Sequence, residues 1–339
     1  IALLAPRRFW LAPSADENSR AMADLVREGL PAFAAASAPD PYFTLTAHDD
    51  LARCRADLRA AITRLRGELA PGERLVLNPT SGTKQMTAAA VLAALDEGLG
   101  EIVFTTGERA DGVVRTGTET LTAFDPSGYF RERDLATARD LFAAGAFAPA
   151  ARVLARHGTT LGRARALCLT LHHWRRFAYP EAVTAATDHW EDLRRALATR
   201  AQHAAAGTPS LLLLGDVLAW AEHARRLGEA GDCLTLAYKA LELAARFALH
   251  TTCGLQPTRT GRFPLDTVRA VARSTETDGR LAKLARDGEV ALGLALACTL
   301  LSENDHPLGH AFDADARLRQ LTFVRNESVH DLRPPEMHE

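Results

Sequence analysis

Residues 74–90, RLVLNPTSGTKQMTAAA, decide how the first part of the chain is organised. Residues 75–77 form a short apolar run, typical of a buried parallel strand. Residues 78–82 interrupt this run with turn-forming residues. From Thr83 onward, apolar residues recur at helical spacing. The stretch therefore predicts a strand, a tight polar loop and a helix.

The predicted loop has the chemistry of an anion site. The start of a helix presents unpaired N–H groups and a partial positive charge. Lys84 adds a full charge there, and the chain has only two other lysines, Lys239 and Lys283. The stretch contains neither a G-x-x-x-x-G-K-[ST] phosphate loop nor a G-x-G-x-x-G dinucleotide fingerprint. An alternative is that Gly82 only permits a sharp turn and Lys84 is simply solvated.

The same loop resembles the (S/T)-G-(G)-T-K-x-M motif of CARF domains, the cyclic-oligoadenylate sensors of type III CRISPR systems. This chain has Ser81 where many members carry a first glycine. The resemblance implies that the loop lies in a pocket on a dimer twofold axis and contacts the ribose–phosphate ring of the ligand. The ligand-binding residues expected on this basis are Asn78, Thr80, Ser81, Gly82, Thr83, Lys84 and Thr106.

The residues around this stretch alternate between strand and helix patterns. Helices are expected at about 16–36 and 49–69, besides the one from Thr83; strands are expected at 1–5, 43–47, 75–77, 102–106 and 113–115. The first helix carries Met22, Leu25, Val26 and Leu30 on one face. Such alternation predicts an α/β Rossmann-like domain with a parallel sheet, whose ligands lie beyond the carboxyl ends of the strands. CARF domains normally begin with an earlier strand, so we expect that strand to be missing here and the list of ligand contacts to be incomplete.

The strand pattern ends near residues 124–128, FDPSG. From about residue 131 to 330, nearly every segment has helical periodicity and is rich in Ala, Leu and Arg. This predicts an all-α region. The segment 232–250 is strongly amphipathic, with Leu236, Lys239, Ala240, Leu243 and Phe247 along one stripe.

The last predicted helix, LRQLTFVRNESVH at 318–330, contains an Arg-Asn-x-x-x-His pattern at Arg325, Asn326 and His330. Two other Arg–His pairs share this spacing, but one lacks the Asn and the other spans two prolines. A histidine near its neutral pKa can act as general acid or base, and an arginine stabilises charge on a phosphoryl group. In a helix, Arg325 and His330 would lie about 140° apart around the axis, so one helix alone makes a poor site.

This pattern is similar to the motif of HEPN ribonucleases, and residues 238–242 resemble the helix that precedes it in that family. Together with the CARF-like loop, it resembles the stand-alone CARF–HEPN ribonucleases. The resemblance implies a homodimer with a composite cleft, a single-stranded RNA substrate, no metal and products ending in 2′,3′-cyclic phosphate. The expected domains are CARF-like (1–126), a helical connector (127–207) and HEPN-like (208–339).

Composition limits the other functions. The chain has 40 Lys and Arg against 42 Asp and Glu, so no overall basic charge favours duplex nucleic acid. No helix-turn-helix with a basic recognition helix is present, which argues against DNA as a partner. The five cysteines are scattered, and Cys168 with His172 and His173 is interpreted as helix packing. Without an apolar run long enough to span a bilayer, we expect a cytoplasmic protein that does not bind membranes.

The sequence thus predicts an endoribonuclease with catalytic residues Arg325, Asn326 and His330, no cofactor or metal, and cyclic oligoadenylate as allosteric activator. Two alternatives stay open. One is a non-catalytic sensor that binds RNA or protein. The other is a ring nuclease that degrades cyclic oligoadenylate itself. The ring size of the activator is not predicted.

Overall fold

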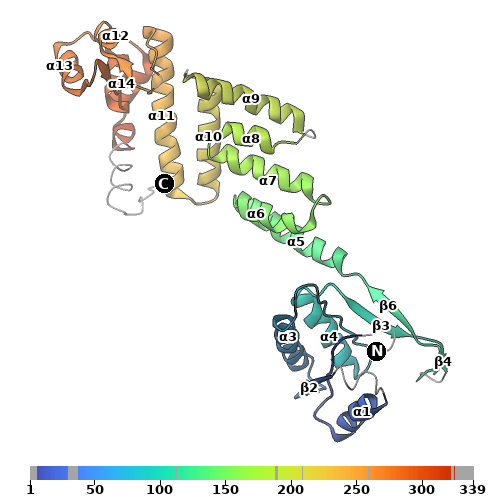
Figure 1. The fold of residues 1–339 in the computed structure, drawn as a ribbon. Helices are drawn as coiled ribbons and strands as arrows, with labels where there is room; N and C mark the ends of the chain where they lie inside the picture. The colour runs from blue at the N-terminus through green and yellow to red at the C-terminus, as the bar shows by residue number, and fades with distance from the viewer. Residues whose placement is uncertain are drawn as a thin grey trace. The chain divides into compact units, whose positions relative to one another are not determined.

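The computed structural model describes residues 6–29, 37–110, 113–115, 117–187, 190–207, 209–258, 260–321 and 324 (Figure 1). The chain divides into two compact units, Ile1–Leu135 and Ala136–Glu339. The division falls within α5 (Ser127–Ala143). The three-part domain boundaries expected from the sequence stay a prediction.

The first unit alternates short strands with helices, as the sequence predicts. Its elements are β1 (Phe9–Leu11), α1 (Glu17–Glu28), β2 (Ser37–Tyr42), α3 (Leu51–Gly67), α4 (Lys84–Asp96), β3 (Ile102–Thr106), β4 (Arg109–Ala110), β5 (Val113–Val114), β6 (Thr120–Phe124) and the start of α5. The helices begin where short polar side chains cap them: Asp16, Asp50 and Thr83 each accept a hydrogen bond from a backbone N–H of the first turn. Such caps satisfy donors that have no partner inside the helix.

The parallel sheet predicted for this unit is only partly present. Among the described residues the strands form two-stranded sheets, of which β1–β2 is parallel and β3–β6 antiparallel. The predicted strand at 75–77 is wrong as a strand, because only Leu77 makes a bridge, parallel to Ile102. The strand expected at 43–47 is likewise replaced by β2, with a single parallel bridge from Leu45 to Ser14. Apolar side chains at these positions indicate that the segment is packed against the core. Such a segment need not pair with a neighbour as a hydrogen-bonded strand.

Two further expectations about this unit need correction. The first helix ends at Glu28 and not near residue 36. Gly29 forms its C-cap, and glycine is a poor helix former. Its predicted apolar face points outward, since Met22 and Leu25 are 61% and 59% exposed. The sequence run 1–5 lies outside the described residues, and β1 supplies a strand immediately before α1.

The core of the first unit forms where α3 packs against α4 (Figure 1). Four alanines of α4 are fully or almost fully buried in this core: Ala89, Ala90, Ala93 and Ala94. They pack in one cluster with Cys54, Leu58 and Ile62 of α3. Side chains this small let the two helices approach closely. Ile102, at the start of β3, joins the same cluster. This packing fixes the start of α4, and with it the preceding loop, next to β3.

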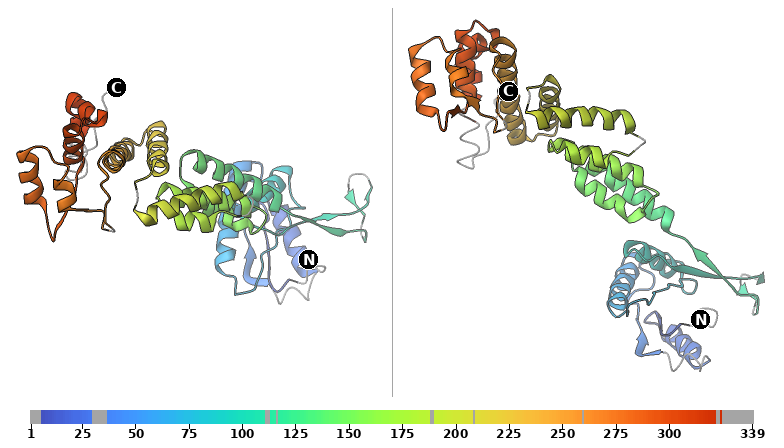
Figure 2. Two further views of the ribbon diagram at one scale, coloured as in Figure 1. Left: turned by 90° about the horizontal axis from the view of Figure 1, so that it is seen from above. Right: turned by 45° about the horizontal axis from the view of Figure 1, so that its top comes forward.

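The second unit is helical, as predicted. Its elements are α6 (Phe147–Leu154), η1 (Ala155–His157), α7 (Gly162–Arg175), α8 (Tyr179–Ala185), α9 (Glu191–Ala206), α10 (Leu211–Arg226), α11 (Ala230–Cys253), β7 (Phe263–Pro264), α12 (Leu265–Arg269), α13 (Thr275–Leu284), β8 (Glu289–Val290), α14 (Leu294–Glu303) and α15 (Pro307–Ala314). Neighbouring helices from α6 to α9 pack side by side in chain order (Figure 2). The sequence did not predict the short antiparallel pair β7–β8.

A buried carboxylate joins four helices of this unit. Asp216 of α10 is 4% exposed. It accepts hydrogen bonds from Nε1 of Trp174 at 2.9 Å and from the hydroxyl of Tyr179 at 3.1 Å, and it pairs with Nε of Arg200 at 2.8 Å. The donors come from α7, α8 and α9, so the network sets how these helices meet α10.

The end of the second unit has its own core. Residues of α11 and α14 dominate it, including Leu249, Leu300 and Leu301, which are fully buried. Leu318 also packs against this cluster, within a helical stretch at 316–321. Among the described residues, no single helix is long and apolar enough to cross a membrane; α9 and α10 pass that test only as a pair bent by 110°.

Candidate ligand-binding site

The loop between residues 77 and 84 is held at both ends. At its far end, the Thr83 hydroxyl accepts a hydrogen bond from the Met86 N–H at 3.2 Å and donates to the His48 carbonyl at 3.2 Å. Thr83 therefore caps α4 and ties the loop to the segment before α3. At the near end, Pro79 is buried. The exposed part of the loop lies between these two anchors.

Gly82 is required by the turn itself. Its φ is +115°, a conformation that L side chains rarely adopt. A Cβ at this position would also lie 3.2 Å from the Cβ and Cε of Met86. The turn directs the chain into α4, whose first N–H groups have no partner within the helix.

Ser81 and Lys84 are exposed on either side of Gly82. Within the described residues, Lys84 makes no ion pair, and the Ser81 side chain makes no hydrogen bond. A hydroxyl, a cation and a helix N-terminus thus lie within four consecutive residues. This arrangement can bind phosphate oxygens.

Asn78 and Thr80 are connected to β3 by hydrogen bonds. Nδ2 of Asn78 donates to Oγ1 of Thr105 at 3.0 Å, and the Thr105 N–H donates to Oγ1 of Thr80 at 2.7 Å. The structure therefore brings the predicted loop next to the carboxyl end of β3, as expected. Thr105 was not among the predicted site residues.

Thr106, the last predicted ligand residue, belongs to a row of exposed hydroxyls. Its Oγ1 lies 3.0 Å from that of Thr120 and 3.1 Å from that of Thr122. Both partners lie on β6, and sequence reasoning missed them because the antiparallel register of β3 and β6 carries no local signal. No hydrogen bond joins Thr106 to the loop among the described residues.

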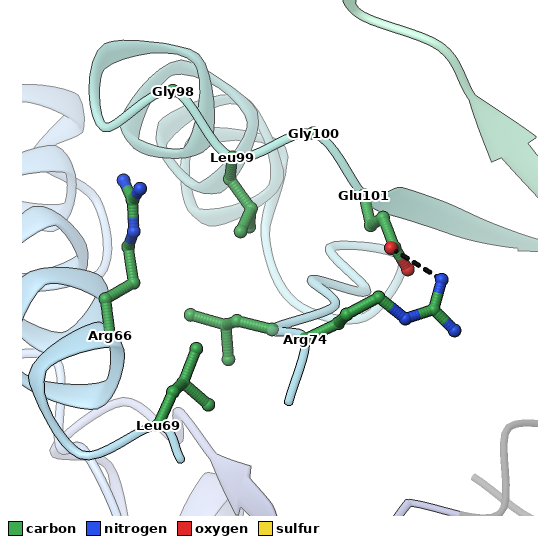
Figure 3. A pocket seen from close by; sticks show the side chains of 8 residues that line it. Arg66, Leu69, Arg74, Gly98, Leu99, Gly100 and Glu101 are labelled. Carbon is green, nitrogen blue, oxygen red and sulfur yellow. Dashed lines mark hydrogen bonds and ion pairs between the residues drawn. The ribbon is translucent and has the colours of Figure 1, made fainter. Parts of the chain in front are cut away.

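A cavity of ≈ 230 Å³ lies elsewhere in the first unit (Figure 3). Its lining includes Arg66, Leu99 and Glu101, and an Arg74–Glu101 ion pair of 2.9 Å crosses part of it. The cavity lies where β3 begins, whereas residues 78–84 and Thr106 lie where it ends. None of the predicted site residues lines it. The bridge from Leu77 to Ile102 is parallel, and ligands bind beyond the carboxyl ends of parallel strands, which favours the loop that follows Leu77 over this cavity.

The predicted catalytic residues Arg325, Asn326 and His330 lie outside the described residues. The helical stretch at 316–321, packed through Leu318, is the described part of the helix predicted to carry them. The upstream helix α11 spans the predicted segment 232–250. There, Nζ of Lys239 pairs with Glu242 at 3.3 Å along the helix.

Cys168 and His172 fit the interpretation of this group as helix packing. Cys168 is buried in α7, and burial raises the pKa of its thiol. Burial, followed by the charges of His173, Arg176 and Arg152, lowers the pKa of the neighbouring His172. No group of three or more His, Cys, Asp or Glu is placed to hold a metal ion in the part of the chain that the structure describes.

Comparisons with known proteins bear on both ends of the chain. Residues 202–338 match the family model of the Csm6 HEPN domain. The solved structure of Enterococcus italicus Csm6 bound to cyclic hexa-2′-fluoro-hexa-dAMP matches with a TM-score of 0.63 and 11% sequence identity, covering 98% of this chain and 81% of that chain. No curated protein sequence matches. The resemblance found in the sequence is confirmed at this level: through the sequence of its C-terminal region and the fold of nearly its whole length, the chain is similar to Csm6, a CARF–HEPN protein of type III CRISPR systems.

Proposed function

We propose that this chain is a cyclic-oligoadenylate-activated, metal-independent endoribonuclease that cuts single-stranded RNA in the cytoplasm during type III CRISPR defence. The observation that carries the proposal is the match of residues 202–338 to the Csm6 HEPN domain. This stretch contains Arg325, Asn326 and His330, the residues to which we assign catalysis.

The residue types supply the chemistry. The ribose 2′-oxygen attacks the adjacent phosphorus, a 2′-O–P bond forms, and the bond to the 5′-oxygen of the next nucleotide breaks. His330 exchanges a proton with the attacking or leaving oxygen, and Arg325 stabilises the negative charge on the phosphoryl oxygens. Asn326 is four positions before His330, so in the helix predicted from the sequence the two share a face and Asn326 can orient the histidine ring. The products are a 2′,3′-cyclic phosphate and a 5′-hydroxyl.

The site is completed by a second copy of the chain. Five positions separate Arg325 from His330, which corresponds to about 140° around the helix predicted from the sequence, so one such helix would present them in different directions. Two such helices facing each other across a twofold axis bring the Arg and His of both copies to one phosphate. The proposal therefore includes a homodimer with a composite cleft.

The activator binds at the first unit. We assign its site to the loop residues Asn78, Thr80, Ser81, Gly82, Thr83 and Lys84 with Thr106, in a Rossmann-like CARF domain. The fold match to a Csm6 bound to a cyclic hexa-dAMP analogue supports cyclic hexa-adenylate as the first activator to test. The ligand shifts the dimer toward its cutting arrangement by as much as it binds that arrangement more tightly.

One assay tests activity and regulation together. RNA cleavage is measured with EDTA present, with cyclic hexa-adenylate, with cyclic tetra-adenylate and with no nucleotide. We expect cleavage in EDTA with one of the rings and little without it. A strict requirement for added metal contradicts the mechanism, and indifference to both rings contradicts the regulation.

A variant separates catalysis from sensing. His330→Ala is expected to lose RNA cleavage and to keep its affinity for the ring. Full cleavage by this variant would remove the assignment of His330. Linear products formed from the ring itself would support the ring-nuclease alternative.

A further inference from the structure

Three side chains at the end of β3 form a closed set of hydrogen bonds, which we call the loop latch: Asn78, Thr80 and Thr105. Oγ1 of Thr80 donates to Oδ1 of Asn78 at 2.6 Å, and the Thr80 N–H donates to the same oxygen at 3.1 Å. Nδ2 of Asn78 donates to Oγ1 of Thr105 at 3.0 Å, and the Thr105 N–H donates back to Oγ1 of Thr80 at 2.7 Å.

The orientation of each group in the latch is determined by its partners. The Thr80 N–H can only donate, so the atom of the Asn78 amide facing it must be the oxygen. That places Nδ2 toward the Thr105 hydroxyl. Likewise, the Thr105 N–H can only donate, so Thr80 accepts from it and must use its single hydroxyl proton toward Asn78.

These bonds use most of the hydrogen-bonding capacity of the two loop residues. Both lone pairs of the Asn78 amide oxygen are occupied, and one of its two N–H groups is used. The hydroxyl proton of Thr80 is also used. Of the side-chain donors of Asn78 and Thr80, one Nδ2–H is left for an anion by these bonds. By contrast, Ser81 and Lys84, two of the exposed residues that follow, make no side-chain hydrogen bond within the described part of the chain.

Among the residues assigned to the activator site, we propose that Asn78 and Thr80, together with Thr105 of β3, are positioning residues that hold residues 79–83 against β3, while Ser81, Gly82 and Lys84 contact the ligand. This deepens the proposed function and rests on it. The anchor is a paired strand, since Thr105 lies opposite Leu121 in the β3–β6 register. A site attached to a rigid element keeps its geometry better than one on a free loop.

The exposure of Asn78 and Thr80 distinguishes a role in positioning the ligand loop from a role in stabilising the core. Asn78 and Thr80 are exposed, and neither belongs to the buried core around α3 and α4. Exposed hydrogen bonds between neutral groups add little to the stability of a whole domain. Loss of the latch should therefore change ligand affinity far more than it changes the melting temperature.

Two substitutions of one residue provide the main test. Thr80→Val removes the hydroxyl and keeps the shape, and Thr80→Ser restores the hydroxyl. Affinity for cyclic hexa-adenylate and cyclic tetra-adenylate is measured by calorimetry on the full chain. We expect Thr80→Val to weaken binding by ~10-fold, equivalent to about 1.4 kcal/mol, and Thr80→Ser to bind nearly as the original chain does.

A double-mutant cycle distinguishes positioning from direct contact. If Asn78 and Thr80 act through one network, the double variant Asn78→Ala with Thr80→Val should lose no more affinity than the single variant that binds the ring less tightly. The loss should also be insensitive to salt, unlike that of Lys84→Gln, which removes a charge. Additive losses, or a Thr80→Val variant that binds as tightly as the original chain, overturn the latch.

Hydrogen exchange separates failure of this inference from failure of the proposed function. Without ligand, Thr80→Val should speed exchange of the Thr105 amide, because that N–H loses its acceptor. Unchanged exchange overturns the latch even if the ring binds. If the original chain binds neither ring, the proposed function fails and the ligand role of the latch fails with it.

Discussion

Single residues of the candidate site contribute either a backbone conformation or a charge. Gly82 supplies a φ of +115°. Lys84 supplies a cation at the first position of α4. The neighbouring polar side chains Asn78, Thr80 and Thr83 are engaged in hydrogen bonds that shape the loop. Each role can be tested by changing one residue.

Gly82→Ala should destabilise the loop. The new Cβ meets Met86 and the backbone must keep an unfavourable φ, a strain that costs about 1–3 kcal/mol. We expect a lower melting temperature and weaker ring binding. Gly100→Ala is the matched control, because Gly100 has no positive φ and open space at its Cβ position. Equal effects of the two substitutions would show that the turn at Gly82 has no special requirement.

Lys84→Gln should weaken ring binding without unfolding the chain. A hydrogen bond to a charged group contributes about 1.5–3 kcal/mol, so affinity should fall by ~10-fold to ~100-fold. The loss should shrink at high salt, where the original attraction is already screened. Lys283→Gln, on the exposed face of α13, provides the control and should bind normally. Unaltered affinity of Lys84→Gln would remove Lys84 from the site.

At the scale of elements, polar side chains decide where helices start and which helices meet. Thr83 caps α4 and contacts the His48 carbonyl just before α3. In the second unit, Glu303 of α14 accepts hydrogen bonds from Ser274 and Thr277, both at 2.6 Å, at the start of α13. One carboxylate thus links the ends of two helices and makes their contact dependent on pH.

Glu303→Gln should remove a pH-dependent part of the stability. Burial raises the pKa of Glu303, but hydrogen bonds from Ser274, Thr277 and the backbone outweigh burial and hold it below its ordinary value of 4.5. A carboxyl whose pKa is lower when folded stabilises the protein above its unfolded pKa and loses this effect as pH falls through the folded pKa.

Melting temperatures of the original chain and Glu303→Gln, measured from neutral pH down into acid, provide the check. The difference between them should be largest at neutral pH and should shrink below pH 4.5, the ordinary pKa of this carboxyl. A difference that stays constant over the whole range would show that the charge of Glu303 has no role in linking α13 to α14.

At the level of the entire chain, the proposed function depends on two regions far apart in the sequence. The loop at 78–84 belongs to the first unit, and the stretch that matches the Csm6 HEPN domain belongs to the second. Helix α5 runs across the division between the units. The proposed composite cleft needs a second copy of the chain. It therefore predicts an effect of mixing subunits that a site within one subunit would not show.

Mixing subunits should reveal a shared cleft. In the proposed cleft an Arg and a His come from each copy, so an excess of His330→Ala chain should lower the activity of a fixed amount of original chain. The measurement is activated RNA cleavage after the two proteins are incubated together long enough to exchange subunits. A variant with both His330→Ala and a disrupted dimer should not inhibit. Activity unaffected by excess His330→Ala would contradict the shared cleft.

Features that depend on local interactions are predictable from the residues alone. The apolar spacing within each segment predicts helices α3 and α4, because that spacing is a local pattern. Strand β3 was predicted with its observed ends, and the helical character of the second unit followed from periodicity alone. The CARF-like loop and the Arg325–His330 pattern resemble those of a CARF–HEPN protein, and the family and fold matches agree with that resemblance.

Which distant segments contact one another is set by the tertiary structure. It paired β3 with β6, turned the apolar face of α1 outward, and left residues 75–77 with a single bridge. It also joined Thr105 to Asn78 and Thr80, residues more than twenty positions away in the chain. Hydrogen bonds between distant segments depend on how the whole unit packs, and a periodic pattern in one segment carries no information about its partner.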